Sequence, residues 1–158
     1  QAHKVMAAAP LSYVGVFRNA DINDVAAKAD ALSLSAVQLH GDEDQAYIDA
    51  LRHVLAPQVQ IWKAQSVGAT LPARNLKHVD KYVLDNGQGG TGQRFDWSLL
   101  RGEVLDNVLL AGGLSPDNCV EAAKSGCAGL DFNSGVESQP GIKDPSKLAS
   151  VFKTLRAY

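Results

Sequence analysis

Residues 82–87 read Tyr-Val-Leu-Asp-Asn-Gly, a short apolar run that passes directly into a polar turn. Runs of the same β-rich, apolar character recur along the chain at intervals of about 20 to 26 residues. The segments between them carry apolar residues at helical spacing, which favours parallel strands joined by covering helices rather than hairpins. The sequence therefore predicts an α/β fold. The six predicted strands are residues 13–17, 36–39, 60–64, 82–85, 108–111 and 129–132.

Helix-capping residues precede several of the predicted helices. Asp21 is placed to cap the first, and the acidic residues 42–44 begin the second. We expect Ser115 to cap the third helix and Gly126 to close it, and Asp144 to cap the last. These signals support the alternation of strands and helices along the whole chain.

Four of the predicted strands end in polar or glycine-rich turns, at residues 40–41, 85–87, 112–113 and 133–135. Because the carboxyl ends of parallel strands meet at one edge of a sheet, candidate chemistry gathers at that edge. Closed (β/α)₈ barrels and open α/β sheets both bind ligands there. Periodicity alone leaves these two architectures open.

The composition is that of one ordinary globular domain spanning residues 1–158, with 46% hydrophobic and 20% charged residues. The net charge is -2 without blocks of like charge, which excludes the field needed to hold a nucleic-acid backbone. No apolar run approaches the roughly 18 residues of a membrane helix, and no signal peptide is recognisable. We therefore expect a soluble, cytoplasmic protein with neither nucleic-acid nor membrane partners. Cys119 and Cys127 have no histidine at a metal-ligand spacing, so no metal site is predicted.

Asp85 is the first candidate for catalysis, because it ends an apolar strand. A carboxylic acid that is partly removed from water favours its protonated form and can donate a proton near neutral pH. The structural alternative is that its carboxylate caps the following turn, accepting a hydrogen bond from Gly87 or a neighbour. Residues 86–94 then include four glycines in nine positions, which is typical of a lid or of a flexible connection.

Two turns on consecutive strands form a candidate phosphate site. Gly112 and Gly113 follow the fifth predicted strand, and Asn133, Ser134 and Gly135 follow the sixth. Glycine lets backbone N–H groups approach an anion, and barrels commonly hold phosphate at neighbouring turns of this kind. Tight turns without a ligand are the alternative.

His40 ends the second predicted strand and precedes Gly41, so we expect it to face the same edge. A lone histidine is more often a hydrogen-bonded structural residue than a catalytic one. It is therefore a candidate substrate contact rather than a candidate catalyst.

Beyond these residues, the chain resembles phosphoribosylanthranilate isomerase along its whole length, most closely the enterobacterial version. The matching segments are Tyr-Val-Gly-Val-Phe at 13–17, Val-Gln-Leu-His-Gly at 37–41, Leu-Asp at 84–85, Gly-Gly-Thr-Gly at 89–92, Phe-Asp-Trp at 95–97, Ala-Gly-Gly-Leu at 111–114 and Asp-Phe-Asn-Ser-Gly-Val-Glu-Ser at 131–138. In that bacterial group the isomerase is the C-terminal half of a bifunctional protein. The resemblance thus implies an indole-3-glycerol-phosphate synthase domain covalently linked upstream.

The resemblance also implies an Amadori rearrangement in tryptophan biosynthesis that uses no cofactor. N-(5'-phosphoribosyl)anthranilate, a small phosphorylated substrate, would open its ribose ring and become 1-(2-carboxyphenylamino)-1-deoxyribulose 5-phosphate. Asp85 matches the family's general acid, which protonates the furanose ring oxygen. The positions matching the family's phosphate-binding turns are Gly112, Gly113, Ser134 and Gly135.

The family fold is a (β/α)₈ TIM barrel, and the six predicted strands match its strands 3–8, so strands 1–2 are expected to be missing. The family's general base is a cysteine on the first strand, and an arginine after the second strand helps to bind the anthranilate. Neither stretch is among these 158 residues, and the positions of Cys119 and Cys127 do not suit the base. We therefore expect 1–158 to be an N-terminally truncated isomerase domain that is inactive in isolation.

Two other functions are open at this point. One is an inactive phosphate-binding fragment of the same barrel. The other is a different phosphate-binding barrel enzyme, such as ribulose-phosphate 3-epimerase or the tryptophan synthase α chain. The catalytic carboxylates of those enzymes lie elsewhere, and the motif at 89–97 does not suit them.

Overall fold

A computed structural model describes residues 6, 7, 9–87 and 94–157 of the chain. Two compact units can be distinguished. Unit 1 comprises Gln1–Ala64 and Arg74–Tyr82, and unit 2 comprises Gln65–Ala73 and Val83–Tyr158.

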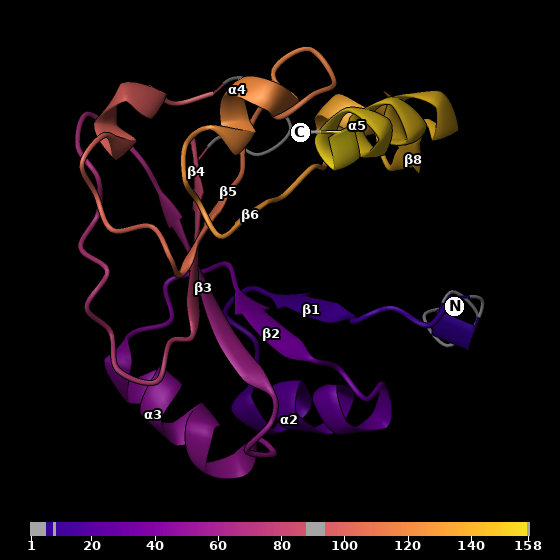
Figure 1. The fold of residues 1–158 in the computed structure, drawn as a ribbon. Coiled ribbons are helices and arrows are strands. Elements are labelled where there is room, and N and C mark those ends of the chain that lie inside the picture. Colours follow the sequence, from indigo (N-terminus) through magenta and orange to yellow (C-terminus); the bar gives the residue numbers. More distant parts are fainter. Residues whose placement is uncertain (1–5, 8, 88–93, 158) are drawn as a thin grey trace. The chain divides into compact units, whose positions relative to one another are not determined.

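Six strands are hydrogen-bonded in the order β1-β2-β3-β4-β5-β6, so that neighbours in sequence are also neighbours in the sheet (Figure 1). Pairing is parallel between β1 and β2, between β2 and β3, and between β5 and β6. The predicted α/β fold is confirmed, and all six predicted strands are present, although the sixth is two residues shorter than expected. The strands are β1 (Val14–Phe17), β2 (Ala36–Leu39), β3 (Gln60–Ser66), β4 (Lys81–Asp85), β5 (Val108–Leu110) and β6 (Gly129–Leu130).

Helices separate most of these strands in the described part of the chain. The α-helices are α2 (Ile22–Ala31), α3 (Gln45–Val54), α4 (Cys119–Ala123) and α5 (Pro145–Ala157), and the 3-10 turns are η1 (Trp97–Leu100) and η2 (Ser134–Val136). A short antiparallel hairpin of β7 (Glu137–Gln139) and β8 (Ile142–Lys143) was not predicted from the sequence.

Aspartate caps begin α2 and α3 of unit 1. The Asp21 side chain accepts hydrogen bonds from the N–H groups of Asn23 and Asp24 at the start of α2. Asp44 accepts one from the N–H of Tyr47 at the start of α3. The predicted helix starts at 21 and 42–44 are therefore confirmed.

The core of unit 1 lies between its helices and one face of its strands. Its fully buried side chains include Val25 of α2, Ile48 and Leu51 of α3, and Val37, Leu39 and Ile61 of the strands. Burial of each such side chain contributes about 1.5–3 kcal/mol of hydrophobic free energy. Because successive side chains of a strand point to opposite faces, Gln38 lies on the face of β2 away from these helices.

Unit 2 has its own core, formed by β4, β5, α4 and the segments between them. The buried residues of this core are Val67, Leu84, Phe95, Leu100, Leu105, Val108, Leu110, Leu114 and Ala122. Burial thus explains why β4 and β5 are apolar. Polar residues are found where these strands end.

The prediction that Ser115 caps a helix closed by Gly126 is wrong. The helix α4 is capped by Asn118 and is followed by Lys124. The Asn118 side chain bonds back to Gly113 O and to the N–H of Ser115, which holds residues 115–118 in a turn instead of a helix. Gly126, with φ of 81°, lies in the connection after the helix.

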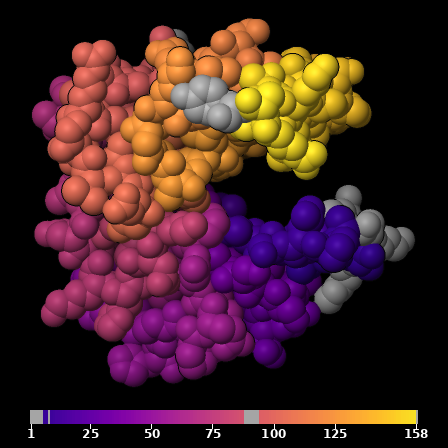
Figure 2. Space-filling view, in the orientation of Figure 1, coloured from indigo at the N-terminus to yellow at the C-terminus, as the bar shows by residue number. Residues whose placement is uncertain are grey.

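The predicted cap of the last helix is confirmed, because Asp144 Oδ1 accepts hydrogen bonds from the N–H groups of Ser146 and Lys147. Only Val151 of α5 is buried, and Phe152 is 56% exposed. Figure 2 shows α5 in yellow on the surface of unit 2.

Candidate functional site

The ends of β4, β5 and β6 in unit 2 carry adjacent turns. Asp85 is the last residue of β4, and a Cβ atom added to Gly112 would lie 3.5 Å from both Cα and Cβ of Asp85. A Cβ atom added to Gly135 would overlap Leu114 O. The Asp85 turn therefore touches the turn after β5, and that turn touches the one after β6.

Asp85 is partly buried, and its carboxylate is held by the turn that follows. Its Oδ1 accepts a hydrogen bond of 2.7 Å from the N–H of Gly87, while its carbonyl accepts one of 2.7 Å from Val67. The capping role considered as an alternative is thus present. This hydrogen bond also restrains the orientation of the carboxyl group at the strand end.

The glycine-rich segment after Asp85 was predicted to be a lid or a connection, and residues 88–93 of it lie outside the described residues. Its downstream flank is anchored. Arg94 lies over the Trp97 ring, 4.8 Å from the centroid, and forms an ion pair of 2.6 Å with Glu121. Phe95 is buried in the core of unit 2.

The turn after β5 has an unusual backbone at two consecutive positions. Gly112 and Gly113 have φ of 80° and 69°, in the left-handed region that favours glycine. Asn118 Nδ2 donates to Gly113 O and Asn118 Oδ1 accepts from the Ser115 N–H, each at 2.9 Å. Asn118 was missed in the sequence, although an asparagine three residues after a serine is a known local hydrogen-bonding pattern.

The turn after β6 contains the other predicted phosphate residues. Asn133 is exposed, while Ser134 and Gly135 begin η2, in which the N–H of Val136 donates to Asn133 O at 3.3 Å. The Lys143 ammonium folds back onto this turn and donates to Asn133 O at 3.0 Å and to Asn133 Oδ1.

Lys143 also forms an ion pair of 2.7 Å with Glu137. The hydrogen bond from Lys143 is the main cause that lowers the pKa of Glu137. Lys143 was missed in the sequence, because nothing near position 143 indicates that its side chain returns to the turn ten residues earlier.

His40 belongs to unit 1, whereas the other candidates belong to unit 2. It is exposed just after β2, and its Nδ1 lies 3.3 Å from Nε2 of the buried Gln38. An amide nitrogen only donates, so this contact makes Nδ1 the acceptor and places the ring proton of a neutral His40 on Nε2. The structural reading of His40 as a hydrogen-bonded residue is thus supported.

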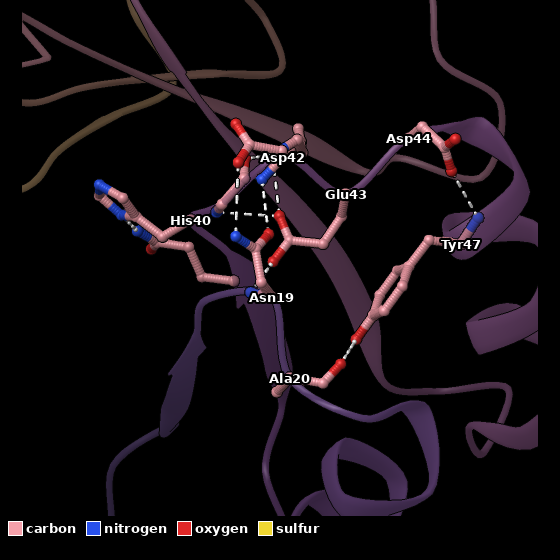
Figure 3. A network of polar contacts seen from close by, with 10 residues as sticks. Asn19, Ala20, His40, Asp42, Glu43, Asp44 and Tyr47 are labelled. Carbon is pink, nitrogen blue, oxygen red and sulfur yellow. Dashed lines mark hydrogen bonds and ion pairs between the residues drawn. The ribbon is translucent and has the colours of Figure 1, made fainter.

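A polar network in unit 1 holds the turns around His40 (Figure 3). Glu43 accepts hydrogen bonds from the N–H groups of Asn19 at 2.7 Å and Gly41 at 2.9 Å. Asn19 Oδ1 accepts from the N–H of Asp42 at 2.7 Å. The ends of β1 and β2 are thereby joined through one carboxylate.

Lys63 of the neighbouring strand β3 completes this network. Its ammonium forms a 3.0 Å ion pair with Glu43 and donates to Gly41 O at 2.6 Å. The side chains of Lys63 and Glu43 are 7% and 1% exposed, respectively. Burial by itself would raise the pKa of Glu43, but the hydrogen bonds from Asn19, Lys63 and Gly41 outweigh it and hold the pKa below its ordinary value of 4.5. Neither residue was singled out in the sequence, although a lysine within an apolar strand indicates a buried partner.

Residues 6, 7, 9–87 and 94–157 form neither a metal-ligand cluster nor a membrane-spanning helix. No three His, Cys, Asp or Glu side chains gather there in a group suited to a metal ion. No helix in these ranges has the length and apolar character needed to cross a bilayer.

The chain matches one family model and is similar to bacterial tryptophan biosynthesis proteins. Residues 1–154 match the family model for N-(5'phosphoribosyl)anthranilate (PRA) isomerase. The tryptophan biosynthesis protein TrpCF of Salmonella typhi is 73% identical over 158 residues, which are 100% of this chain and 35% of that protein. TrpCF of Yersinia pestis is 66% identical over 157 residues, with coverage of 99% and 33%. The chain thus spans about a third of the length of these relatives.

Solved structures agree with the sequence relatives. The phosphoribosyl anthranilate isomerase of Thermus thermophilus superposes with a TM-score of 0.82 at 29% identity, covering 99% of this chain and 78% of that one. Another solved phosphoribosyl anthranilate isomerase, in complex with reduced 1-(o-carboxyphenylamino)-1-deoxyribulose 5-phosphate, gives a TM-score of 0.76 at 28% identity, with coverage of 99% and 78%.

These matches extend over the same segments that suggested the resemblance, from the first predicted strand to the last helix. They include both the strand that ends at Asp85 and the two glycine turns beside it. The chain belongs to the N-(5'-phosphoribosyl)anthranilate isomerase family.

Proposed function

We propose that the whole protein containing this chain rearranges N-(5'-phosphoribosyl)anthranilate to 1-(2-carboxyphenylamino)-1-deoxyribulose 5-phosphate in tryptophan biosynthesis. The family match of residues 1–154 supports this proposal. The observation that carries it is the row of adjacent turns in unit 2, with Asp85 beside Gly112 and Gly135 against Leu114. One phosphorylated sugar can meet an acid and an anion-binding turn at this row.

Asp85 is the proposed general acid. It donates its proton to the furanose ring oxygen, and the bond from that oxygen to C1 breaks as the anthranilate nitrogen lone pair forms an iminium. A base then removes the proton from C2, and the resulting enolamine tautomerises to the ketone. C1 is reduced as C2 is oxidised, so the reaction balances without an external electron carrier. We assign the base to no residue of this chain.

The turns after β5 and β6 are the proposed phosphate site. Backbone N–H groups at glycine turns can surround a phosphate without a side chain in the way. The residues are Gly112, Gly113, Asn133, Ser134 and Gly135. His40 stays a predicted substrate contact.

We further propose that β1–β6 are strands 3–8 of a (β/α)₈ barrel and that residues 1–158 are part of an isomerase domain. The chain aligns over 99% of its own length with only 78% of the Thermus thermophilus enzyme, which supports this view. Strands 1 and 2 would then supply the base and the anthranilate-binding arginine. The linked synthase domain accords with the 35% coverage of TrpCF, and the cytoplasmic location belongs to the same proposal.

An assay with the fluorescent substrate tests the proposal. The complete protein is expected to turn over N-(5'-phosphoribosyl)anthranilate, and a folded complete protein without turnover would contradict the assignment. The 158-residue chain alone tests the alternative of an inactive fragment. We expect no measurable turnover from it, because loss of a general base costs about 10² to 10⁴ in rate. The family match does not favour ribulose-phosphate 3-epimerase.

A further inference from the structure

Lys143 contacts the predicted phosphate turn without belonging to it. Its ammonium donates to both oxygens of Asn133, the carbonyl at 3.0 Å and the side-chain Oδ1. We infer that Lys143 is a positioning residue for phosphate, which sets the direction of the backbone N–H and side-chain amide donors at Asn133 and Ser134. This inference rests on the proposed function.

The planarity of the peptide bond carries the first step. In a trans peptide the C=O and the following N–H point in opposite directions. Lys143 holds the Asn133 carbonyl on one side, so the N–H of Ser134 is directed to the other side. An ammonium on the carbonyl also polarises the peptide, which makes that N–H a stronger donor.

The side chain of Asn133 gives the second step. An ammonium only donates, so the atom it contacts must be the amide oxygen, and the two ends of the amide are thereby distinguished. The Nδ2 group of Asn133 is then directed away from Lys143. One lysine therefore orients two donors of the same turn.

The hairpin explains why Lys143 can do this. β7 and β8 pair Glu137 with Lys143, and the N–H of Asp144 donates to Val136 O at 2.8 Å. The backbone of Lys143 is thus fixed beside η2. Its side chain needs only to extend along the turn, where the ion pair with Glu137 restricts it further.

The position of the turn at 133–135 connects the contacts of Lys143 to the proposed phosphate site. Gly135 lies against Leu114 O, so a rotation of the peptides at 133–135 would disturb the contact with the turn after β5. The ammonium does not itself need to touch the phosphate. Its contribution is expected in substrate affinity rather than in the proton transfer.

Lys143→Met in the complete protein tests the inference, with inorganic phosphate as a competitive probe. We expect the KM for substrate and the inhibition constant of phosphate each to rise about tenfold, with kcat changed less than about threefold. Lys143→Arg retains the donor and should recover most of the affinity. The unfolding midpoint should stay close to wild type, because the Lys143 side chain is 41% exposed.

Lys147→Met is the matched control, because Lys147 carries the same charge nearby but donates to Glu137 O. It should change the phosphate inhibition constant less than about twofold. An equal loss of phosphate affinity in both variants would show that Lys143 acts only through its charge, and it would overturn the inference. An unchanged constant in Lys143→Met would overturn it too, while wild-type turnover would leave the isomerase function standing. Absence of wild-type turnover would instead contradict the proposed function.

Discussion

Each unit has a glutamate–lysine ion pair beside its strand ends, but the two pairs differ in burial. In unit 1, the Lys63 and Glu43 side chains are 7% and 1% exposed, and they connect the turns after β1 and β2 to β3. In unit 2, Lys143 and Glu137 are 41% and 13% exposed and hold a single turn. A buried charge that loses its partner is costly, whereas an exposed pair contributes little to stability. The comparison predicts that loss of a partner costs more stability in the first pair, whereas the second pair is the one that we propose to orient groups for a ligand.

Lys63→Met should give the largest effect on stability. It leaves the Glu43 carboxylate buried without its counter-charge, and we expect a loss of about 3–5 kcal/mol in the free energy of unfolding. Denaturant-induced unfolding of the complete protein, monitored with a probe in the isomerase domain, measures this free energy. Lys143→Met, the corresponding change in unit 2, should cost less than about 1 kcal/mol. Similar losses in both variants would break the distinction between the pairs.

Asp85→Asn tests whether unit 2 carries chemistry rather than stability. The amide retains an oxygen that can accept from Gly87 N–H but cannot supply the proton, so kcat should fall at least about a hundredfold. Steady-state kinetics of the complete protein, together with phosphate inhibition that stays near wild type, checks this expectation. A kcat equal to that of the wild type would remove Asp85 from the acid role.

Gly113→Val should weaken substrate binding by obstructing the turn after β5. Gly113 has φ of 69°, so a β-branched residue also strains the backbone there. We expect KM to rise at least about tenfold. Gly102→Val serves as the control for strain, because Gly102 has φ of 80° and open space around it. If both variants raise KM equally, the effect is not specific to the phosphate turn.

Asn118→Asp should produce a smaller change at the same turn. The carboxylate still accepts from the Ser115 N–H but no longer donates to Gly113 O. We expect KM to rise about threefold to tenfold, since one hydrogen bond contributes about 1 kcal/mol. Asn118→Ala, which removes both bonds, should be worse. A KM for Asn118→Asp equal to the wild-type value would show that substrate binding does not depend on the hydrogen bond from Asn118 to the Gly113 carbonyl.

Acid should weaken the buried ion pair of unit 1. The pKa of Glu43 lies below 4.5 in the folded protein, so its stabilising contribution is present above that value and is lost as the pH falls through the folded pKa. The free energy of unfolding should therefore decrease with falling pH below about 4.5. Glu43→Gln should flatten this slope more than Glu137→Gln does, because the pKa of Glu137 is also lowered by Lys143 but its ion pair is the more exposed of the two. An unchanged slope in Glu43→Gln would contradict the stabilising role of the pair.

Local signals account for what the sequence predicted well. The strands follow from apolar runs, and the caps at Asp21 and Asp144 act within three residues of their targets. Ser115 failed as a cap because the Asn118 side chain bonds to Ser115 N–H and Gly113 O and holds this segment in a turn. The predicted site residues at the ends of β4, β5 and β6 could be placed because a strand end is itself a local feature. Their chemical roles stay predictions.

Side chains that return from a distance could not be predicted. Lys63 meets Glu43 twenty residues away, and Lys143 meets Asn133 ten residues away. Neither spacing corresponds to a helical or strand period, so no pattern in the sequence indicates the pairing. The hairpin that positions Lys143 is only five residues of strand, too short to give an alternating pattern.

The missing side chain of Gly135 has a consequence for redesign. A hydrogen atom at this position lets the Leu114 carbonyl lie directly against the neighbouring turn, so the spacing of the two proposed phosphate turns depends on the absence of a side chain at residue 135. Enlarging the proposed phosphate site for a bulkier acidic group would therefore require a change in the backbone of these turns. Substitution of other residues in these turns would leave the spacing between the turns unchanged.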